Sequence, residues 1–204
     1  MPVLGPRLKI IRRLGTPLPG LTRKDGERRP YPPGVHGQKP VRRKKNEFRR
    51  QLEEKQKMRF HYGVSEAQLR RAFEAATKQP GRTGDNLFSL LERRLSNVVF
   101  RLGFAPTIPA ARQLVSHGNV LVNGRRLDRP SALVSVGDVI TLSEKSRSGP
   151  SVLDAITRGP QVRLPGYLAL DPSEKFEGRV INMPMRGDVP FIVDEAAIVE
   201  FYAR

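Results

Sequence analysis

The 204-residue sequence has no cysteine, no tryptophan and only three histidines. Without cysteine the chain can form neither a disulfide framework nor a thiolate metal site. The histidines (His36, His61 and His117) are far apart in the sequence, so we expect no metal ion and no other cofactor. No apolar run approaches the roughly 18 residues that span a bilayer, and the first residues lack the apolar core of a signal peptide. We therefore expect a soluble protein of the cytoplasm, with the stroma of a plastid or another organelle as the alternative.

Acidic residues are scarce relative to basic ones. The chain has 37 lysines and arginines against 20 aspartates and glutamates, a formal net charge of +17. Residues 1–60 hold 18 basic and 5 acidic side chains, residues 61–130 hold 11 and 5, and residues 131–204 hold 8 and 10. This imbalance predicts a nucleic acid as the partner of the first two thirds of the chain. The near-neutral last third is left for packing or for another protein.

The first 45 residues are predicted to form an extended basic arm. Prolines in residues 29–34 (RPYPPG) exclude a helix there, because proline fixes its own φ and moves the preceding residue out of the α region. Such a segment is either a disordered tail or an arm that becomes ordered when phosphates neutralise its charge. We favour the arm.

Three helices are predicted next. Residues 46–60 have few apolar side chains, so we expect this helix to lie along a phosphate backbone rather than in a core. Residues 65–77 form a clearer helix that starts with Ser65 and Gln68 as a capping box. The apolar residues of 85–102 follow the helical period and predict one continuous core helix, with Arg94, Asn97 and Arg101 on its other face.

Residues 93–150 are predicted to form a small α+β module. After the end of the long helix, Thr107 caps a second helix that stops at Gly118. A hairpin over residues 120–127 follows, because Asn-Gly at 123–124 supplies the two positive-φ positions of a type I′ turn. A strand over residues 139–142 completes the module.

The predicted architecture is therefore α+β, with four parts. They are the arm (1–45), the first part of a mostly helical domain (46–92), the α+β module (93–150) and a C-terminal segment (151–204). Within the last segment we expect a short strand at 191–193 and an apolar segment at 196–202. Because the core of residues 46–92 is thin, we expect the C-terminal segment to pack back on it.

Basic and polar side chains of the arm, the first helix and the module indicate an RNA-binding surface. Arginine forms bidentate contacts with phosphate, while Gln, Ser and Asn reach phosphate, 2′-OH or base edges. Two short helices would also suit the major groove of DNA, but no dimerising helix is evident and the proline-rich arm suits an irregular RNA better. The predicted RNA-binding residues are Arg12, Arg13, Arg42, Arg43, Lys44, Lys45, Arg49, Arg50, Lys55, Lys57, Arg59, Arg94, Arg101, Arg112, Gln113, Ser116, His117, Asn119, Asn123, Arg125 and Arg126.

Seven segments match those of a known family in the same order and spacing. They are GPRLKIIRRLG (5–15), RPYPPGVHGQ (29–38), LEEKQKMRFHYGV (52–64), TGDNLFSLLERRLSNVVFRLGF (83–104), ARQLVSHGNVLVNG (111–124), VGDVITLSEKSR (136–147) and IVEFYAR (198–204). On these segments, which run nearly from end to end, the chain resembles the ribosomal protein S-four family of the bacterial-type small ribosomal subunit.

The resemblance implies a discontinuous helical domain with the RNA-binding module inserted in it. It implies primary binding to small-subunit ribosomal RNA (rRNA) at a multi-helix junction, which nucleates assembly of the subunit body. Such proteins also contact ribosomal protein five, which affects decoding accuracy, and lie near the channel through which mRNA enters. For the contact with protein five we predict Glu200 and Tyr202. We expect no homo-oligomer.

Two further points concern metal and catalysis. Many relatives hold zinc with four cysteines near the N-terminus, so this cysteine-free chain resembles the metal-free branch, in which RNA contacts order the arm. The same module occurs in pseudouridine synthases and some tyrosyl-tRNA synthetases, and residues 126–128 (RLD) resemble the synthases' catalytic motif. However, the sequence has no room for a further catalytic domain and no recognisable catalytic signature, so we expect no enzyme. A free-standing RNA-binding or DNA-binding regulator stays the alternative.

Overall fold

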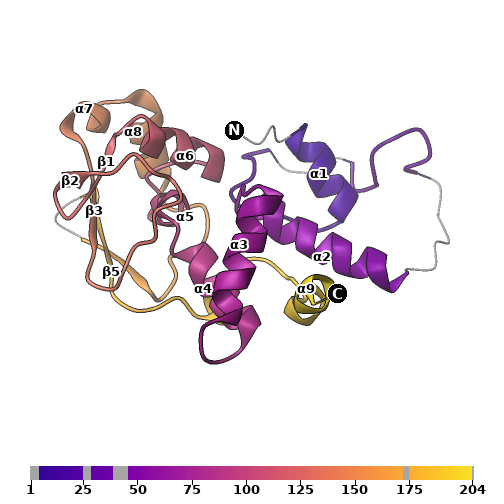
Figure 1. Ribbon diagram of the computed structural model, residues 1–204. Helices are drawn as coiled ribbons and strands as arrows, with labels where there is room; N and C mark the ends of the chain where they lie inside the picture. The colour runs from indigo at the N-terminus through magenta and orange to yellow at the C-terminus, as the bar shows by residue number, and fades with distance from the viewer. Residues whose placement is uncertain (1–4, 25–28, 39–45, 172–174, 204) are drawn as a thin grey trace. The chain divides into compact units, whose positions relative to one another are not determined.

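The computed structural model describes residues 5–24, 29–38, 46–171 and 175–203 (Figure 1). The chain forms two compact units: unit 1 consists of residues 1–87 and 191–204, and unit 2 of residues 88–190. The predicted α+β class is confirmed, and so is the discontinuous helical domain, because the chain leaves unit 1 at residue 87 and returns to it at residue 191.

Unit 1 is helical in its described residues. Its elements are α1 (Arg7–Leu14), α2 (Glu47–His61), α3 (Glu66–Thr77), the first half of α4 (Thr83–Glu92) and α9 (Glu195–Tyr202). The predicted capping box of α3 is confirmed: the Ser65 side chain accepts from the Gln68 N–H, and the Gln68 side chain accepts from the Ser65 N–H, both at 3.2 Å. The strand predicted at 191–193 is wrong, since these residues are irregular and lead into α9.

Helix α1 corrects the prediction that the whole arm is extended. Leu8, Ile11 and Leu14 recur at the helical spacing and are half-buried, whereas Lys9 and Arg13 are exposed. Gly15, with a φ of 64°, ends the helix and donates its N–H to the carbonyl of Ile11. A short amphipathic helix therefore carries part of the arm's charge.

Helix α2 belongs to the core of unit 1, so the prediction that it lies outside a core is wrong. One stripe of α2 is buried, consisting of Gln51, Lys55, Met58 and His61. This stripe faces α9: the Gln51 amide donates to Glu200 at 2.8 Å, and the Lys55 ammonium lies 4.7 Å from the centre of the Phe201 ring. The apolar face that α2 lacks in its own sequence is thus replaced by polar groups that find partners on α9.

Unit 2 contains a five-stranded antiparallel sheet covered by short helices. The strands are β1 (Val120–Val122), β2 (Arg125–Arg126), β3 (Val139–Leu142), β4 (Leu168–Leu170) and β5 (Glu177–Val180), in the order β2-β1-β3-β5-β4. The helices are α5 (Leu95–Arg101), α6 (Ile108–Ser116), α7 (Glu144–Arg147) and α8 (Pro150–Arg158), with a 3-10 turn η1 (Arg186–Asp188). Val98 and Val99 of α5, Ala111 and Val115 of α6, and Ile140 of β3 lie in one fully buried core.

Strands β4 and β5 correct the predicted domain boundary at residue 150. Residues 151–190 complete the sheet of unit 2, because β5 pairs with β3 through Ile140 opposite Gly178, and β4 pairs with β5. Any side chain at Gly178 would collide with Leu102, so the close approach requires glycine. Only residues 191–204 of the predicted C-terminal segment return to the helical unit.

The long helix predicted at 85–102 is broken at Arg94. α4 ends at Glu92 and α5 starts at Leu95, and Arg94 between them is extended, with a ψ of 130°. The loop after the hairpin fills the break: the N–H groups of Leu95 and Ser96 donate to the carbonyls of Ala132 and Pro130. Non-local hydrogen bonds thus replace those that a continuous helix would make. The break also turns α5, so that all of its residues are buried, including Asn97 and Arg101.

Candidate RNA-binding surface

Helix α6 presents polar side chains opposite its buried face. Thr107 caps it by accepting from the Ala110 N–H at 3.3 Å, as predicted, and Ile108, Ala111 and Val115 face the core. Arg112, Gln113 and Ser116 then fall within about 100° of the helix surface. Gln113 and Ser116 are exposed, as is His117 at the helix end, while Arg112 and Asn119 are half-exposed.

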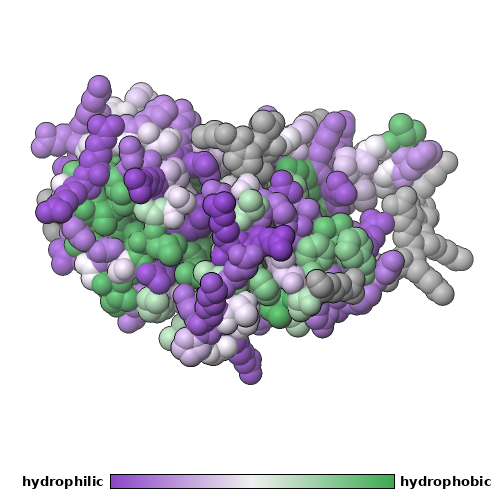
Figure 2. Space-filling view, in the orientation of Figure 1, coloured by the Kyte–Doolittle hydropathy of each residue, from purple (hydrophilic) through white to green (hydrophobic). Residues whose placement is uncertain are grey.

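The β1–β2 hairpin extends this surface. Asn123 and Gly124 have φ values of 51° and 75°, so the predicted turn is confirmed. The Asn123 side chain has a structural role, because its amide donates to Asp138 at 2.8 Å and its oxygen accepts from the Val139 N–H at 2.9 Å. Arg125 and Arg126 are exposed. Figure 2 shows hydrophilic side chains projecting over the β2 edge of unit 2.

Gly118 brings the hairpin and α6 together. Arg126 donates to the carbonyl of His117 at 3.2 Å, and its guanidinium occupies the space that a side chain at Gly118 would fill. Gly118 also has a φ of 69°, which favours glycine. The sequence indicated Gly118 only as the end of a helix; its second role, making room for Arg126, depends on a contact eight residues away.

Arg94 and its neighbour Arg112 form the most unusual part of this surface. Arg94 is only 9% exposed, and no hydrogen-bond acceptor for its buried Nε atom is found in the described part of the chain. Burial, and secondarily the charge of Arg112, lower the pKa of Arg94 to about 10, so it stays protonated at neutral pH. A positive charge that is largely buried beside a second one is unfavourable by itself. Binding of an anion such as a phosphate to the two arginines would offset this cost. We call Arg94, Arg112, Gln113, Ser116, His117, Asn119, Arg125 and Arg126 the α6–hairpin surface.

Arg101 does not belong to that surface, contrary to the prediction. Its guanidinium pairs with the Glu92 carboxylate at 2.8 Å, with side chains 1% and 0% exposed. Glu92 also accepts from the Asn97 amide at 2.7 Å and from the Tyr167 hydroxyl at 2.9 Å. Burial and the Glu92 charge raise the pKa of Tyr167, which keeps this hydroxyl a donor. Arg101 is therefore the counter-ion of a buried acid that joins the α4–α5 break to residue 167.

The predicted basic residues of unit 1 divide into exposed and buried ones. Arg13, Arg49 and Arg50 are exposed, and Arg12 and Arg59 are half-exposed. Lys55 is 5% exposed, paired with Glu66 at 2.8 Å, and Lys57 pairs with Glu54 at 2.6 Å with both side chains 13% exposed. Lys55 therefore joins α2 to α3, whereas Lys57 pairs within α2. The predicted residues Arg42, Arg43, Lys44 and Lys45 lie outside the described residues.

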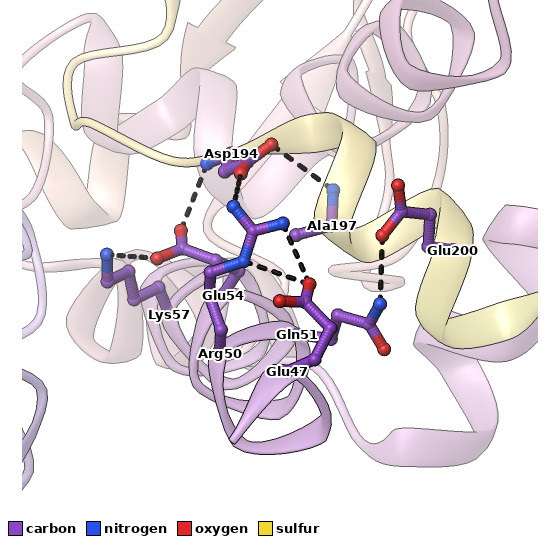
Figure 3. A network of polar contacts seen from close by, with 8 residues as sticks. All are labelled: Glu47, Arg50, Gln51, Glu54, Lys57, Asp194, Ala197 and Glu200. Carbon is purple, nitrogen blue, oxygen red and sulfur yellow. Dashed lines mark hydrogen bonds and ion pairs between the residues drawn. The ribbon is translucent and has the colours of Figure 1, made fainter. Parts of the chain in front are cut away.

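The two residues predicted to contact a protein lie on α9, Glu200 against α2 and Tyr202 against α3. Figure 3 shows Arg50 between Glu47 and Asp194, at 2.8 and 3.2 Å, with Gln51 bonded to Glu200 beside it. Tyr202 donates to Glu66 at 2.9 Å, and burial, followed by this hydrogen bond, raises the pKa of Tyr202. Burial would raise the pKa of Glu66, but hydrogen bonds from Lys55 and Tyr202 outweigh it and hold that pKa below its usual value. Glu200 is exposed and Tyr202 is half-buried.

Two searches of the described residues bear on metals and membranes. Nowhere in ranges 5–24, 29–38, 46–171 and 175–203 do three or more His, Asp or Glu side chains gather in a way that could hold a metal ion. None of the helices in these ranges combines the length and apolar character needed to cross a bilayer.

Comparisons with known proteins cover almost the whole chain. Residues 3–92 match the family model described as the ribosomal protein S4/S9 N-terminal domain, and residues 93–140 match the S4 domain. The small ribosomal subunit protein uS4 of Methylobacillus flagellatus is 51% identical over 200 residues, which are 98% of this chain and 97% of that protein. Proteins of the same name from Thermosynechococcus vestitus and a Geobacillus species are 52% and 50% identical, over 98% of this chain and 96% and 98% of theirs. The chain therefore belongs to the uS4 family of small ribosomal subunit proteins.

Proposed function

We propose that this chain is a structural constituent of the small ribosomal subunit, located in the ribosome, that binds the RNA of that subunit directly. The observation that carries the proposal is Arg94, a largely buried positive charge whose Nε has no acceptor within the described residues and which lies near the charge of Arg112. A protein that stood alone would gain nothing from this arrangement, since burying an unpaired cation is unfavourable. A phosphate bound between the two guanidiniums removes that cost.

The remaining residues of the α6–hairpin surface suit the same partner. Arg125 and Arg126 lie on an exposed hairpin, and Gln113 and Ser116 offer short polar groups on the adjacent helix. Guanidiniums bind phosphates, while amide and hydroxyl groups reach 2′-OH groups or base edges in the wide minor groove of RNA. The exposed arginines of unit 1 would add phosphate contacts to a second part of the RNA. Contacts from both units support binding at a junction of several RNA helices. Such binding in turn supports a role in nucleating assembly of the subunit body.

We further propose that the α2–α9 contact of unit 1 binds ribosomal protein five and thereby affects decoding accuracy. In support, Glu200 is exposed on α9, Arg50 and Asp194 are part-exposed beside it, and the last third of the sequence is nearly neutral. Exposed ion pairs of this kind contribute little to the fold, so their charges can exchange partners when a second protein binds. Contact with mRNA stays a prediction from the resemblance, and residence in the cytoplasm stays a prediction from the sequence.

Sedimentation tests the proposed function. In a lysate fractionated on a sucrose gradient, we expect the chain in small-subunit particles and in whole ribosomes, in a one-to-one ratio with other small-subunit proteins. If the chain stays at the top of the gradient, the ribosomal proposal is wrong and a free-standing regulator becomes the better explanation.

The salt dependence of RNA binding tests the surface itself. Replacing the exposed Arg125 with glutamine removes one predicted phosphate contact. We expect the log–log slope of affinity for small-subunit rRNA against salt concentration to become shallower by about 0.7–0.9. The matched control is Arg158→Gln, which removes an exposed arginine of α8 that pairs with Asp154. An equal change of slope in both variants would contradict the assignment of Arg125 to the surface.

A further inference from the structure

A groove in unit 1 has no role in the surface described so far. It has a volume of about 1440 Å³ and runs between α1, the loop of residues 30–38 and the outer side of α2. Apolar and aromatic side chains line much of it, among them Tyr31, Phe48, Leu52 and Phe60. Phe48 is 48% exposed although it is a large aromatic residue. The sequence offered one signal for this groove, namely aromatic residues within an otherwise basic segment.

The charges around the groove select the chemistry of its occupant. Three arginines (Arg13, Arg49 and Arg59) line it together with one acid, Glu53, which pairs with Arg49 at 2.8 Å. In the sequence, the first 60 residues carry 18 basic and 5 acidic side chains. An apolar groove with a cationic rim is complementary to a nucleotide, whose flat base is apolar on its faces and whose phosphates are anionic. An apolar peptide would use the groove but leave the rim unmatched.

The loop that forms one wall contains a tight turn. The N–H of Gly37 donates to the carbonyl of Gly34 at 3.2 Å, Gly34 has a φ of 110°, and a side chain at Gly37 would collide with the carbonyl of Pro32. Arg12 fixes the start of the loop, because its Nε donates to the Tyr31 carbonyl at 3.0 Å and its guanidinium lies 5.0 Å from the centre of the Tyr31 ring. The loop holds Val35 at its tip, 94% exposed. A tight loop that presents an aromatic wall and an apolar tip resembles a preformed binding site rather than a connection.

We infer that this groove receives an unstacked nucleobase of the bound RNA, with the flanking phosphates on Arg13, Arg49 and Arg59. The inference rests on the proposed function and deepens it: unit 1 would read a single-stranded or bulged nucleotide and not only neutralise phosphates. Bases that are splayed out of a junction stack on aromatic side chains, and stacking tolerates any base because each has a π-face.

Removal of an aromatic ring without loss of charge tests the inference. We expect Tyr31→Leu, and independently Phe60→Leu, to weaken binding of the full chain to a small-subunit rRNA fragment roughly tenfold, with the salt slope unchanged because no phosphate contact is lost. The matched control is Phe73→Leu, which removes a ring of α3 that stacks on Tyr202 outside the groove. This control should bind like the wild type.

A cross-link identifies the occupant directly. Because the chain has no cysteine, Val35→Cys creates a single site for a thiol-reactive photo-cross-linker, and its exposure keeps the fold intact. We expect one cross-link to an unpaired nucleotide, mapped as a stop of reverse transcription, and none from Ala75→Cys on the exposed side of α3. Wild-type affinity in both groove variants, or cross-links confined to paired nucleotides or to protein, would overturn the inference. Failure of the wild-type chain to bind the RNA at all would instead overturn the proposed function.

Discussion

Replacement of Glu92 by glutamine is expected to lower the free energy of unfolding of unit 2 by about 3–5 kcal/mol, because it leaves the Arg101 charge buried without its counter-ion. The two side chains are 0% and 1% exposed, so water cannot solvate the guanidinium in the folded state. Amide hydrogen exchange of α5 and β3, followed by mass spectrometry across a urea series, measures this loss unit by unit in the full chain. A single global transition would mix the two units and hide the effect.

Two variants make this prediction specific to burial. Glu177→Gln breaks a pair with Arg179 in the same sheet, but Arg179 is 56% exposed, so we expect a loss below about 1 kcal/mol. Replacing both partners of the buried pair (Glu92→Met with Arg101→Met) should recover part of the loss, since no charge is left buried, while the Asn97 amide and the Tyr167 hydroxyl still lose their acceptor. If Glu92→Gln and Glu177→Gln destabilise the chain equally, the buried network does not organise unit 2.

Arg94→Met is expected to weaken rRNA binding roughly 10- to 100-fold, the cost of one charge-assisted contact. The same variant should leave the stability of the free protein unchanged or raise it. The reason is the sign of the pKa shift: burial lowers the pKa of Arg94 from 12.5 to about 10, which means that the folded protein disfavours the charged side chain. Methionine fills similar space without that charge.

Opposite effects on binding and stability distinguish a functional charge from a structural one. RNA affinity is measured by filter binding at fixed salt, and stability by hydrogen exchange of α5 in the RNA-free chain. Arg158→Gln, an exposed arginine in the same unit, should change neither by much. A parallel fall of affinity and stability in Arg94→Met would show that Arg94 supports the fold, and that the weaker binding is a consequence of misfolding.

The sequence predicted those features whose causes lie within a few residues of each other. The capping box of Ser65 and Gln68, the cap at Thr107 and the Asn123-Gly124 turn all depend on contacts three residues apart or fewer, and all three are confirmed. The order of elements in residues 107–142 followed from these local signals. Gln113 and Ser116 of α6 are exposed for a similarly local reason, because the apolar face of α6 fixes its polar face.

The predictions that were wrong concern residues whose hydrogen-bond or ion-pair partners lie farther away in the chain. The break at Arg94 exists because carbonyls of residues 130 and 132 accept the N–H groups that a continuous helix would have used internally. Arg101 and Lys55 were predicted to face RNA because each is an arginine or lysine on a helix. Their acids, Glu92 and Glu66, lie nine and eleven residues away, beyond the reach of a helical spacing rule. Strands β4 and β5 are three and four residues long and are held mainly by pairing with β3 and each other.

The discontinuity of unit 1 has a consequence for the order of events during synthesis. All of unit 2 is translated before α9, which supplies the hydrogen-bond partner of Gln51 and the aromatic ring that lies beside Lys55 on α2. Domains fold as units while the chain emerges, so unit 2 can complete its core while the face of α2 that contacts α9 is still uncovered. The α6–hairpin surface can therefore be complete before α9 is made, and α9 closes unit 1 afterwards.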